Sequence, residues 1–239
     1  DKFTVNSDLD TAEELSIRRF GDFSYLAVPI SINNKTGSYS IRLTSENSDI
    51  NLSLNITERL IEDAKMKLAS ATAYEYQSAL ENFVSEIQID DYNSRISEPL
   101  WKDGFVTPVI KFKEGKESYW ISAPPFAAAQ IVDGMKLSVK NFGTHYIKSV
   151  EFDCIEARAV CDGEVAFAGV TTAFGNTVVL DHGAGLFSLY GHLDSSDINS
   201  GQTMKKGDIV GNSSDSGMVM KGGELFFAFL QDGVFVNPF

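Results

Sequence analysis

The residues that could bind a metal or take part in acid–base catalysis are few. The 239-residue chain has three histidines, His145, His182 and His192, and two cysteines, Cys154 and Cys161. A catalytic zinc ion usually takes three protein ligands and keeps a fourth position for the attacking water. No histidine follows His192, and the cysteines lack the C-x-x-C spacing of many zinc sites. Histidine and cysteine alone therefore predict no complete zinc site.

The two cysteines have a second possible chemistry. Cys154 and Cys161 flank a short link between two expected strands. If these strands pair antiparallel, a hairpin disulfide can form, provided that the two Cα atoms lie within about 7 Å. An exported protein permits such a bond. Two buried free thiols are the alternative, and the sequence leaves both open.

The first part of the chain is predicted to form β-strands. An apolar run over 23–32 is followed by alternating apolar and polar residues at 39–43 and 52–56. Strands at this spacing with one apolar face predict a small β-sandwich-like domain over residues 1–71. The segment 57–68 fits either a helix or an extended chain, and its later alternation favours the extended form.

One helix is expected, in a connecting segment over residues 72–98. Thr72 precedes Glu75 by three residues, which is the spacing of a capping box. The apolar residues that then share one helical face are Tyr76, Leu80, Phe83, Val84 and Ile87. We expect this stripe to pack on a neighbouring domain rather than to bind a cofactor, and the helix to end near residues 89–91.

The rest of the chain is predicted to be a second β domain, over residues 99–239. Glycines recur at short intervals from Gly104 to Gly183 and separate short apolar segments. Such a pattern is typical of an all-β fold. The fold class is therefore mainly β: an N-terminal β-sandwich-like domain, one connecting helix and a C-terminal antiparallel β domain.

Several motifs in the C-terminal part are similar to those of one enzyme family. They are Leu180-Asp-His-Gly183, Tyr190-Gly-His-Leu193, Lys205-Lys-Gly-Asp-Ile-Val-Gly211 and Val236-Asn-Pro238. In this order they resemble the lysostaphin-type (LytM) zinc endopeptidases, which cut peptide bonds in bacterial peptidoglycan. The resemblance covers residues 101–239 and, more loosely, a preceding β domain. It implies a lysostaphin-type fold for the C-terminal domain.

The resemblance also assigns positions to the zinc site of the family. Active members use H-x-x-x-D and H-x-H motifs, which here correspond to Ile147 and Glu151, and to Glu224 and Phe226. His192 keeps the histidine that helps to stabilise the reacting carbonyl oxygen. Isoleucine and phenylalanine have no lone pair to offer a metal. Zinc, the cofactor expected in the family, is therefore predicted to be absent, with no catalytic residue left.

The resulting hypothesis is a pseudoenzyme that acts by binding. Relatives that have lost the metal site imply that this chain regulates a cell-wall hydrolase or belongs to an envelope complex. The expected partner is then a hydrolase, an envelope protein or a peptidoglycan peptide. Tyr190, His192, Glu151 and Glu224 are the candidates for contacts in the former groove. The alternative is an active zinc-dependent peptidoglycan endopeptidase with a rearranged site built from His145, His192 and Glu151.

Charge and hydropathy restrict the partners and the location. The net charge of −13 argues against nucleic acid and against electrostatic capture by anionic wall polymers. No stretch approaches the ~20 apolar residues of a membrane span. Asp1 is followed by polar sequence rather than by a basic and then apolar leader. The resemblance implies an extracytoplasmic protein, and we expect any export signal or anchor to have been removed or to lie upstream.

Overall fold

The structure is a computed structural model of the chain. It describes residues 3–9, 15, 17–31, 34–57, 73–89, 98–109, 121–123, 127–132, 135–140, 144–147, 154–194, 197–218 and 225–236. For the four short ranges between 121 and 147, the description is of the backbone. The predicted extended segment 57–68 lies outside these ranges from residue 58 onward.

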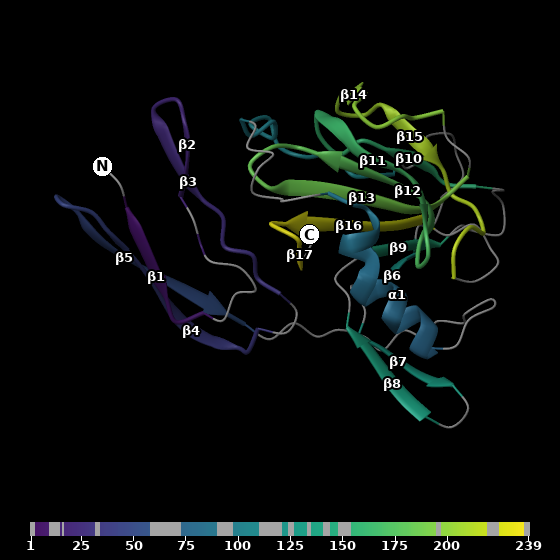
Figure 1. Cartoon of the computed structure of the whole chain (residues 1–239), viewed down its shortest axis with the longest axis horizontal. Helices are drawn as coiled ribbons and strands as arrows, with labels where there is room; N and C mark the ends of the chain where they lie inside the picture. Colours follow the sequence, from purple (N-terminus) through teal and green to yellow (C-terminus); the bar gives the residue numbers. More distant parts are fainter. Residues whose placement is uncertain are drawn as a thin grey trace.

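The N-terminal part is β, as predicted, and is divided into a sheet and a hairpin. Its strands are β1 (Thr4–Ser7), β2 (Ile17–Phe20), β3 (Phe23–Leu26), β4 (Gly37–Thr44) and β5 (Asp49–Ile56). The sheet has the order β1-β4-β5, and β2 and β3 form a separate hairpin; all of these pairs are antiparallel (Figure 1).

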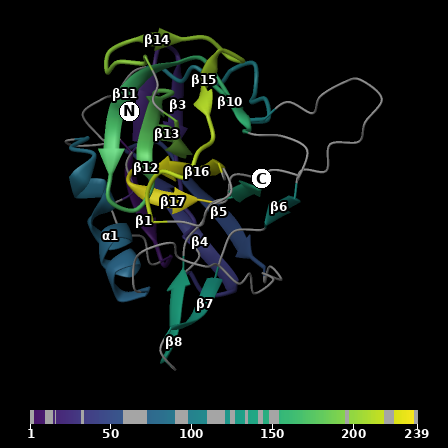
Figure 2. The ribbon, with the colours of Figure 1, turned by 90° about the vertical axis from the view of Figure 1, so that its right-hand side faces the viewer.

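The predicted helix is confirmed as α1 (Ala73–Glu86). Tyr76, Phe83 and Ile87 of the predicted stripe are buried, and Leu80 and Val84 pack against the same core. The chain leaves the helix through Gln88, whose φ is +48°. The apolar stripe thus packs on the C-terminal domain, which α1 flanks in Figures 1 and 2.

The C-terminal domain is built on one large antiparallel sheet. Its strands are β6 (Ile121–Ala123), β9 (Thr144–Ile147), β11 (Gly163–Thr171), β12 (Gly175–Asp181), β13 (Leu186–Leu193), β14 (Thr203–Met204) and β16 (Leu225–Gln231), in the order β14-β11-β12-β13-β16-β9-β6. The strand β17 (Val234–Val236) also pairs with β16. Two further pairs are β7 (Ala127–Val132) with β8 (Met135–Lys140), and β10 (Glu156–Arg158) with β15 (Ile209–Asn212).

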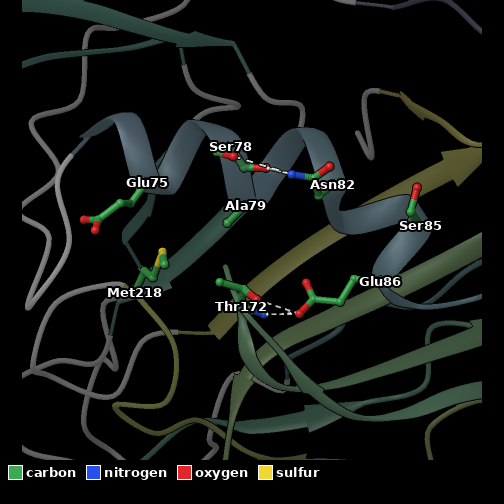
Figure 3. A pocket seen from close by; sticks show the side chains of 8 residues that line it. All are labelled: Glu75, Ser78, Ala79, Asn82, Ser85, Glu86, Thr172 and Met218. Atoms are coloured by element: carbon green, nitrogen blue, oxygen red, sulfur yellow. Dashed lines mark hydrogen bonds between the residues drawn. The ribbon is translucent and has the colours of Figure 1, made fainter.

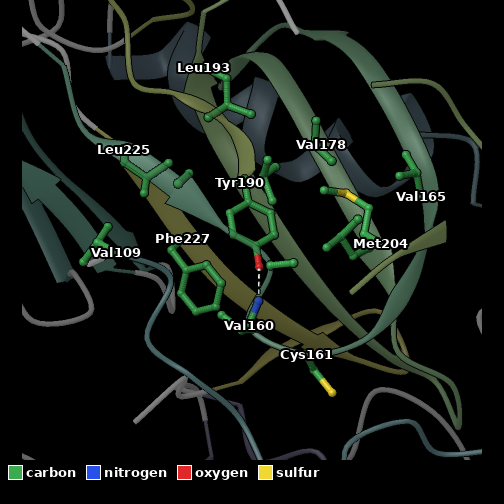
Figure 4. Packing of buried hydrophobic residues seen from close by; sticks show 14 of the residues in the cluster. Val109, Val160, Cys161, Val165, Val178, Tyr190, Leu193, Met204, Leu225 and Phe227 are labelled. Carbon is green, nitrogen blue, oxygen red and sulfur yellow. Dashed lines mark hydrogen bonds between the residues drawn. The ribbon is translucent and has the colours of Figure 1, made fainter. Parts of the chain in front are cut away.

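The two faces of this sheet carry separate apolar cores. Successive strand residues point to opposite faces, so Phe226 of β16 joins the core under α1, which we call the helix-side core. Phe227 joins the other, the far-side core, which also contains Tyr190 (Figure 4). Because both faces of β16 are buried, its side chains alternate between the helix-side core and the far-side core.

The hairpin β2–β3 contacts the C-terminal domain through two side chains. The Arg18 guanidinium donates to Asp232, with Nη2 2.5 Å from Oδ1 and Nη1 3.2 Å from Oδ2, and to the Ala184 carbonyl at 3.3 Å. Both charged side chains are almost fully buried. The ring of Tyr25 meets Trp101 edge-on at 5.9 Å between centroids. These contacts fix the hairpin against the domain.

Candidate functional site

His192 occupies an irregular position at the end of β13. Its neighbours Tyr190 and Leu193 both belong to the far-side core, so strict alternation is broken between them. The φ of His192 is +60°, and the pairing of β12 with β13 shifts register between Asn176 and Val178. A left-handed conformation costs a non-glycine residue on the order of 1–3 kcal/mol, so surrounding contacts must hold it.

Three hydrogen bonds hold His192 in this conformation. Its N–H donates to the Phe174 carbonyl at 2.6 Å, and its carbonyl accepts from the Ser214 N–H at 2.6 Å. The ring Nδ1 lies 2.8 Å from the Ser216 carbonyl oxygen. Because a carbonyl oxygen only accepts, Nδ1 carries a proton. His192 therefore serves to join two loops to the sheet.

These two loops, 171–176 and 213–218, approach each other closely. The Met218 N–H donates to the Ala173 carbonyl at 3.1 Å. Gly175 has a φ of +62°, and a Cβ added to it would lie 2.4 Å from the Gly217 nitrogen. Only glycine fits such an approach. The contact places Phe174, between Ala173 and Gly175, over the helix-side face of the sheet.

An aromatic cluster made by Phe83, Phe174, His192 and Phe226 fills this face. The Phe174 and Phe226 rings are parallel, with an interplanar angle of 6° and 4.3 Å between centroids. The His192 ring lies 5.8 Å from Phe174 and 6.5 Å from Phe226, at steep angles to both. Phe83 of α1 meets Phe174 edge-on at 5.1 Å. All four side chains are at most 1% exposed.

Tyr190, predicted as a groove residue, instead lies inside the far-side core. Its side chain is fully buried, and its hydroxyl accepts the Val160 N–H at 2.9 Å (Figure 4). The Phe227 ring packs 5.3 Å from it. The prediction was wrong because Tyr190 faces away from the aromatic cluster, on the opposite side of the sheet.

The Tyr190 hydroxyl belongs to a buried polar network. Ser188 Oγ lies 3.3 Å from it and 2.7 Å from His182 Nε2. His182 Nδ1 is 2.8 Å from the Asp162 carbonyl oxygen, so Nδ1 is the donor and Nε2 accepts from the serine. Burial lowers the pKa of His182 from 6.5 to about 4. His182 is therefore a neutral structural residue at pH 7.

A pocket lies beside α1. It has a volume of about 560 Å³. Its lining is made by Glu75, Ser78, Ala79, Asn82, Ser85, Glu86, Thr172 and Met218 (Figure 3). Glu86 Oε1 accepts both the N–H and the hydroxyl of Thr172, at 2.8 and 2.6 Å. The sequence analysis missed this pocket. The signal was available in the polar face of the helix, but nothing in the sequence placed loop 171–176 beside it.

The C-terminal part of the chain matches the model of a known protein family. Residues 148–238 match Peptidase family M23. The C-terminal part of this chain is thus similar to that family. The M23 match begins one residue after Ile147 and ends two residues after β17, so it includes the strands that carry His192 and Phe226.

Similar proteins cover different parts of the chain. The murein hydrolase activator EnvC of Escherichia coli (strain K12) is 34% identical over 86 residues, which is 35% of this chain and 20% of that relative. The chain thus matches about a fifth of the length of EnvC. A crystal structure of a peptidase M23 from Pseudomonas aeruginosa covers 98% of this chain and 85% of its own, with 15% identity and a TM-score of 0.59. That likeness shows a shared fold.

The lysostaphin catalytic domain from Staphylococcus simulans is a further similar structure. It covers 50% of this chain and 89% of its own, with 18% identity and a TM-score of 0.42. Together with the M23 match, the mainly β structure confirms the fold class expected from the sequence.

The M23 family implies zinc, and the described residues do not fit it. Phe226, the residue that the sequence analysis assigns to the ligand-histidine position, offers a buried phenyl ring stacked on Phe174. Within the described ranges, no group of three histidine, cysteine or carboxylate side chains lies close enough to hold a metal ion. The Nδ1 of His192 is hydrogen-bonded to the Ser216 carbonyl, so this ring could offer a metal only its Nε2, and one nitrogen does not make a zinc site.

The remaining predicted site residues are placed in part. The Ile147 backbone pairs with Ile121 at the end of β9, and His145 is the Cα partner of Phe226. The side chain of Ile147 lies outside what the structure describes, and so do Glu151 and Glu224 in full. The rearranged site of His145, His192 and Glu151 thus stays untested.

Of the two possibilities left open for Cys154 and Cys161, the hairpin disulfide is not formed. β10 lies between the two cysteines but pairs with β15, while β11 pairs with β12 and β14. The described strands next to the cysteines therefore pair with strands elsewhere in the chain. Both thiols are free; Cys154 is exposed and Cys161 is buried, with its Sγ 3.3 Å from the Leu100 carbonyl oxygen.

Proposed function

We propose that this M23 domain is non-catalytic and works by binding in peptidoglycan processing. The M23 match and the partial similarity to a murein hydrolase activator support a peptidoglycan-related role. The observation that carries the non-catalytic mode is Phe226. Its phenyl ring is fully buried and stacked on Phe174, and we assign its position to the metal-ligand histidine of active relatives on the sequence motif.

The packing around Phe226 strengthens this reading. No hole is left at this position: Phe174 stacks on the Phe226 ring, His192 lies at a steep angle to it, and Phe83 packs against Phe174. Aromatic pairs of this kind contribute about 0.5–1.5 kcal/mol beyond the area they bury. The position therefore stabilises the fold, which is the role of a core residue rather than of a metal ligand.

The kind of partner follows from the charge and from the relative. A chain with a net charge of −13 gains nothing electrostatically from anionic wall polymers. The relative that is similar over 86 residues is named as an activator of murein hydrolases. We infer that the partner is a cell-wall hydrolase or another envelope protein, and that the chain works outside the cytoplasm. Within the described residues, no helix is long and apolar enough to cross a membrane.

Two assays on the purified chain test this proposal. The first follows cleavage of muropeptides with and without a chelator, and the second follows the activity of cell-wall hydrolases when the chain is added. We expect no cleavage in the first assay and a changed rate for one hydrolase in the second. Chelator-sensitive cleavage would instead support an active endopeptidase with a rearranged metal site.

A further inference from the structure

Strand β5 forms one edge of the N-terminal sheet. β4 pairs with it along its whole length, from Thr44 opposite Asp49 to Gly37 opposite Ile56, without a register shift. On its other side, no strand among the described residues pairs with it. An edge strand carries a row of backbone N–H and C=O groups that can pair with another chain.

Natural proteins usually protect such edges, and β5 lacks the usual protection. Residues 50–56 contain no lysine, no proline and no other charged residue. The strand is eight residues long and has no bulge. Ile50 and Leu52, on the apolar face of the strand, are 43% and 45% exposed. Each of these properties makes edge-to-edge pairing easier.

The sequence of β5 is also a palindrome. Residues 50–56 read Ile-Asn-Leu-Ser-Leu-Asn-Ile in both directions. If two copies pair antiparallel about Ser53, each residue meets its own type: Ile50 meets Ile56, Asn51 meets Asn55, and Leu52 meets Leu54. Apolar residues then share one face and polar residues the other, as cross-strand pairing requires.

The charged residue of this strand, Asp49, is already paired with a side chain of the neighbouring strand. Asp49 is the charged residue of β5, and it forms a two-pronged ion pair with Arg42, at 2.6 and 2.9 Å. This pairing holds the pKa of Asp49 below its usual range. On the polar face, Ser40 and Ser38 donate to Asn51 and Asn55, at 2.7 and 3.3 Å. A second copy would therefore meet hydrogen-bonded amides and no unpaired charge on this strand.

We propose that β5 is a self-association edge, at which two copies of the chain pair antiparallel about Ser53. The arrangement joins two three-stranded sheets into one six-stranded sheet. A two-fold axis relates the two copies, so the β5 edge of each is fully paired and no third copy can add there. Among the described strands, the short strand β1 then forms each outer edge of the sheet. The inference goes beyond the proposed function and does not depend on it.

Cysteine cross-linking tests the register. In a Cys154→Ser background, which removes the exposed native thiol, Ser53→Cys places two thiols on the two-fold axis. Directly opposite Cβ atoms lie about 4.5–5.5 Å apart, within reach of a disulfide or a short cross-linker. Asn51→Cys is the matched control, since its copy lies four residues away, about 13 Å along the strand.

We expect Ser53→Cys to form cross-linked dimers, and Asn51→Cys to do so only when mixed with Asn55→Cys. If Ser53→Cys links no better than Asn51→Cys alone, the proposal is overturned.

Sedimentation over a concentration series tests the association itself. We expect the average mass to rise from monomer toward dimer, and Leu52→Lys to weaken association at least about tenfold. Ile209→Lys, at a 50% exposed residue of β15, should leave it unchanged. Because each copy carries −13, higher salt should strengthen the dimer. A monomer at every concentration, or equal losses in both variants, would contradict the proposal.

Discussion

The Phe226 ring lies parallel to the Phe174 ring, 4.3 Å away between centroids, in the interior of the C-terminal domain. Phe174 is held there by the contact between Gly175 and Gly217, and α1 covers it through Phe83. The position that we assign to a metal ligand of active relatives is thus part of the hydrophobic core. Changes at Phe226 should therefore alter stability first.

Truncation of Phe226 measures how far it acts as a core residue. Phe226→Ala should lower the free energy of unfolding by about 3–5 kcal/mol, because it removes a fully buried ring and leaves a cavity. Urea denaturation followed by tryptophan fluorescence gives this value. Phe105→Ala, at a phenylalanine that is 45% exposed, is the control and should have a clearly smaller effect. Equal effects would mean that the cluster does not contribute as described.

His182 should make stability depend on pH in a defined window. Its pKa is about 4 in the folded protein, because of burial, and 6.5 is its ordinary value. Between these values the unfolded chain binds a proton that the folded chain does not, so stability falls as the pH falls from 6.5 to 4. The loss should approach about 3 kcal/mol at pH 4, and stability above pH 6.5 should be unaffected by this group.

The matched variant for this test is His182→Gln, which has no titrating group. Its stability at pH 7 should be lower, since the bonds to Asp162 and Ser188 change. Its slope between pH 6.5 and 4, measured by urea denaturation at several pH values, should be shallower than that of the wild type. An unchanged slope would show that His182 is already protonated or exposed in the folded protein.

The buried ion pair between Arg18 and Asp232 should contribute far more to the free energy of unfolding than the exposed pair between Arg42 and Asp49. Both side chains are at most 9% exposed, so removing either one leaves a buried charge, at a loss of about 3–5 kcal/mol. A double-mutant cycle with Arg18→Met and Asp232→Asn should show strong coupling. The Arg42–Asp49 pair, at 59% and 55% exposure, should show little coupling in the same cycle. Similar coupling in both pairs would contradict the docking of hairpin β2–β3.

Restoring the family residues tests the placement of the zinc motifs. A variant with Ile147→His, Glu151→Asp, Glu224→His and Phe226→His should bind zinc if Ile147, Glu151 and Phe226 correspond to the family's ligands and Glu224 to its catalytic histidine. Zinc uptake is measured by equilibrium dialysis. The same variant with Phe226 retained is the control and should bind much more weakly, since it lacks one ligand. A folded quadruple variant without zinc would show that the motifs are misplaced.

Local sequence patterns predicted the elements that local interactions determine. The helix Ala73–Glu86 follows from a capping-box spacing and a stripe that the core does bury. The β class follows from alternation and glycine turns. The motif at residues 190–193 indicated the fold, but it did not indicate on which face of the sheet each side chain lies. The left-handed conformation of His192 interrupts the alternation from which the faces would be assigned.

Features that depend on distant segments escaped the sequence analysis. Cys154 and Cys161 looked like a hairpin pair, but β10 pairs with β15, about fifty residues away in the chain. The pocket beside α1 needs Thr172 and Met218, which only the tertiary fold brings to the helix. The Arg18–Asp232 pair joins opposite ends of the chain. No periodicity or spacing encodes such contacts.

The zinc content of the purified, folded wild-type chain tests the central claim most directly. After dialysis against excess zinc and then against buffer, elemental analysis should find far less than one zinc per chain, because the residue that we assign to a ligand position, Phe226, carries a buried phenyl ring. One tightly held zinc per chain, lost together with His192 in His192→Ala, would contradict the claim and indicate a working metal site.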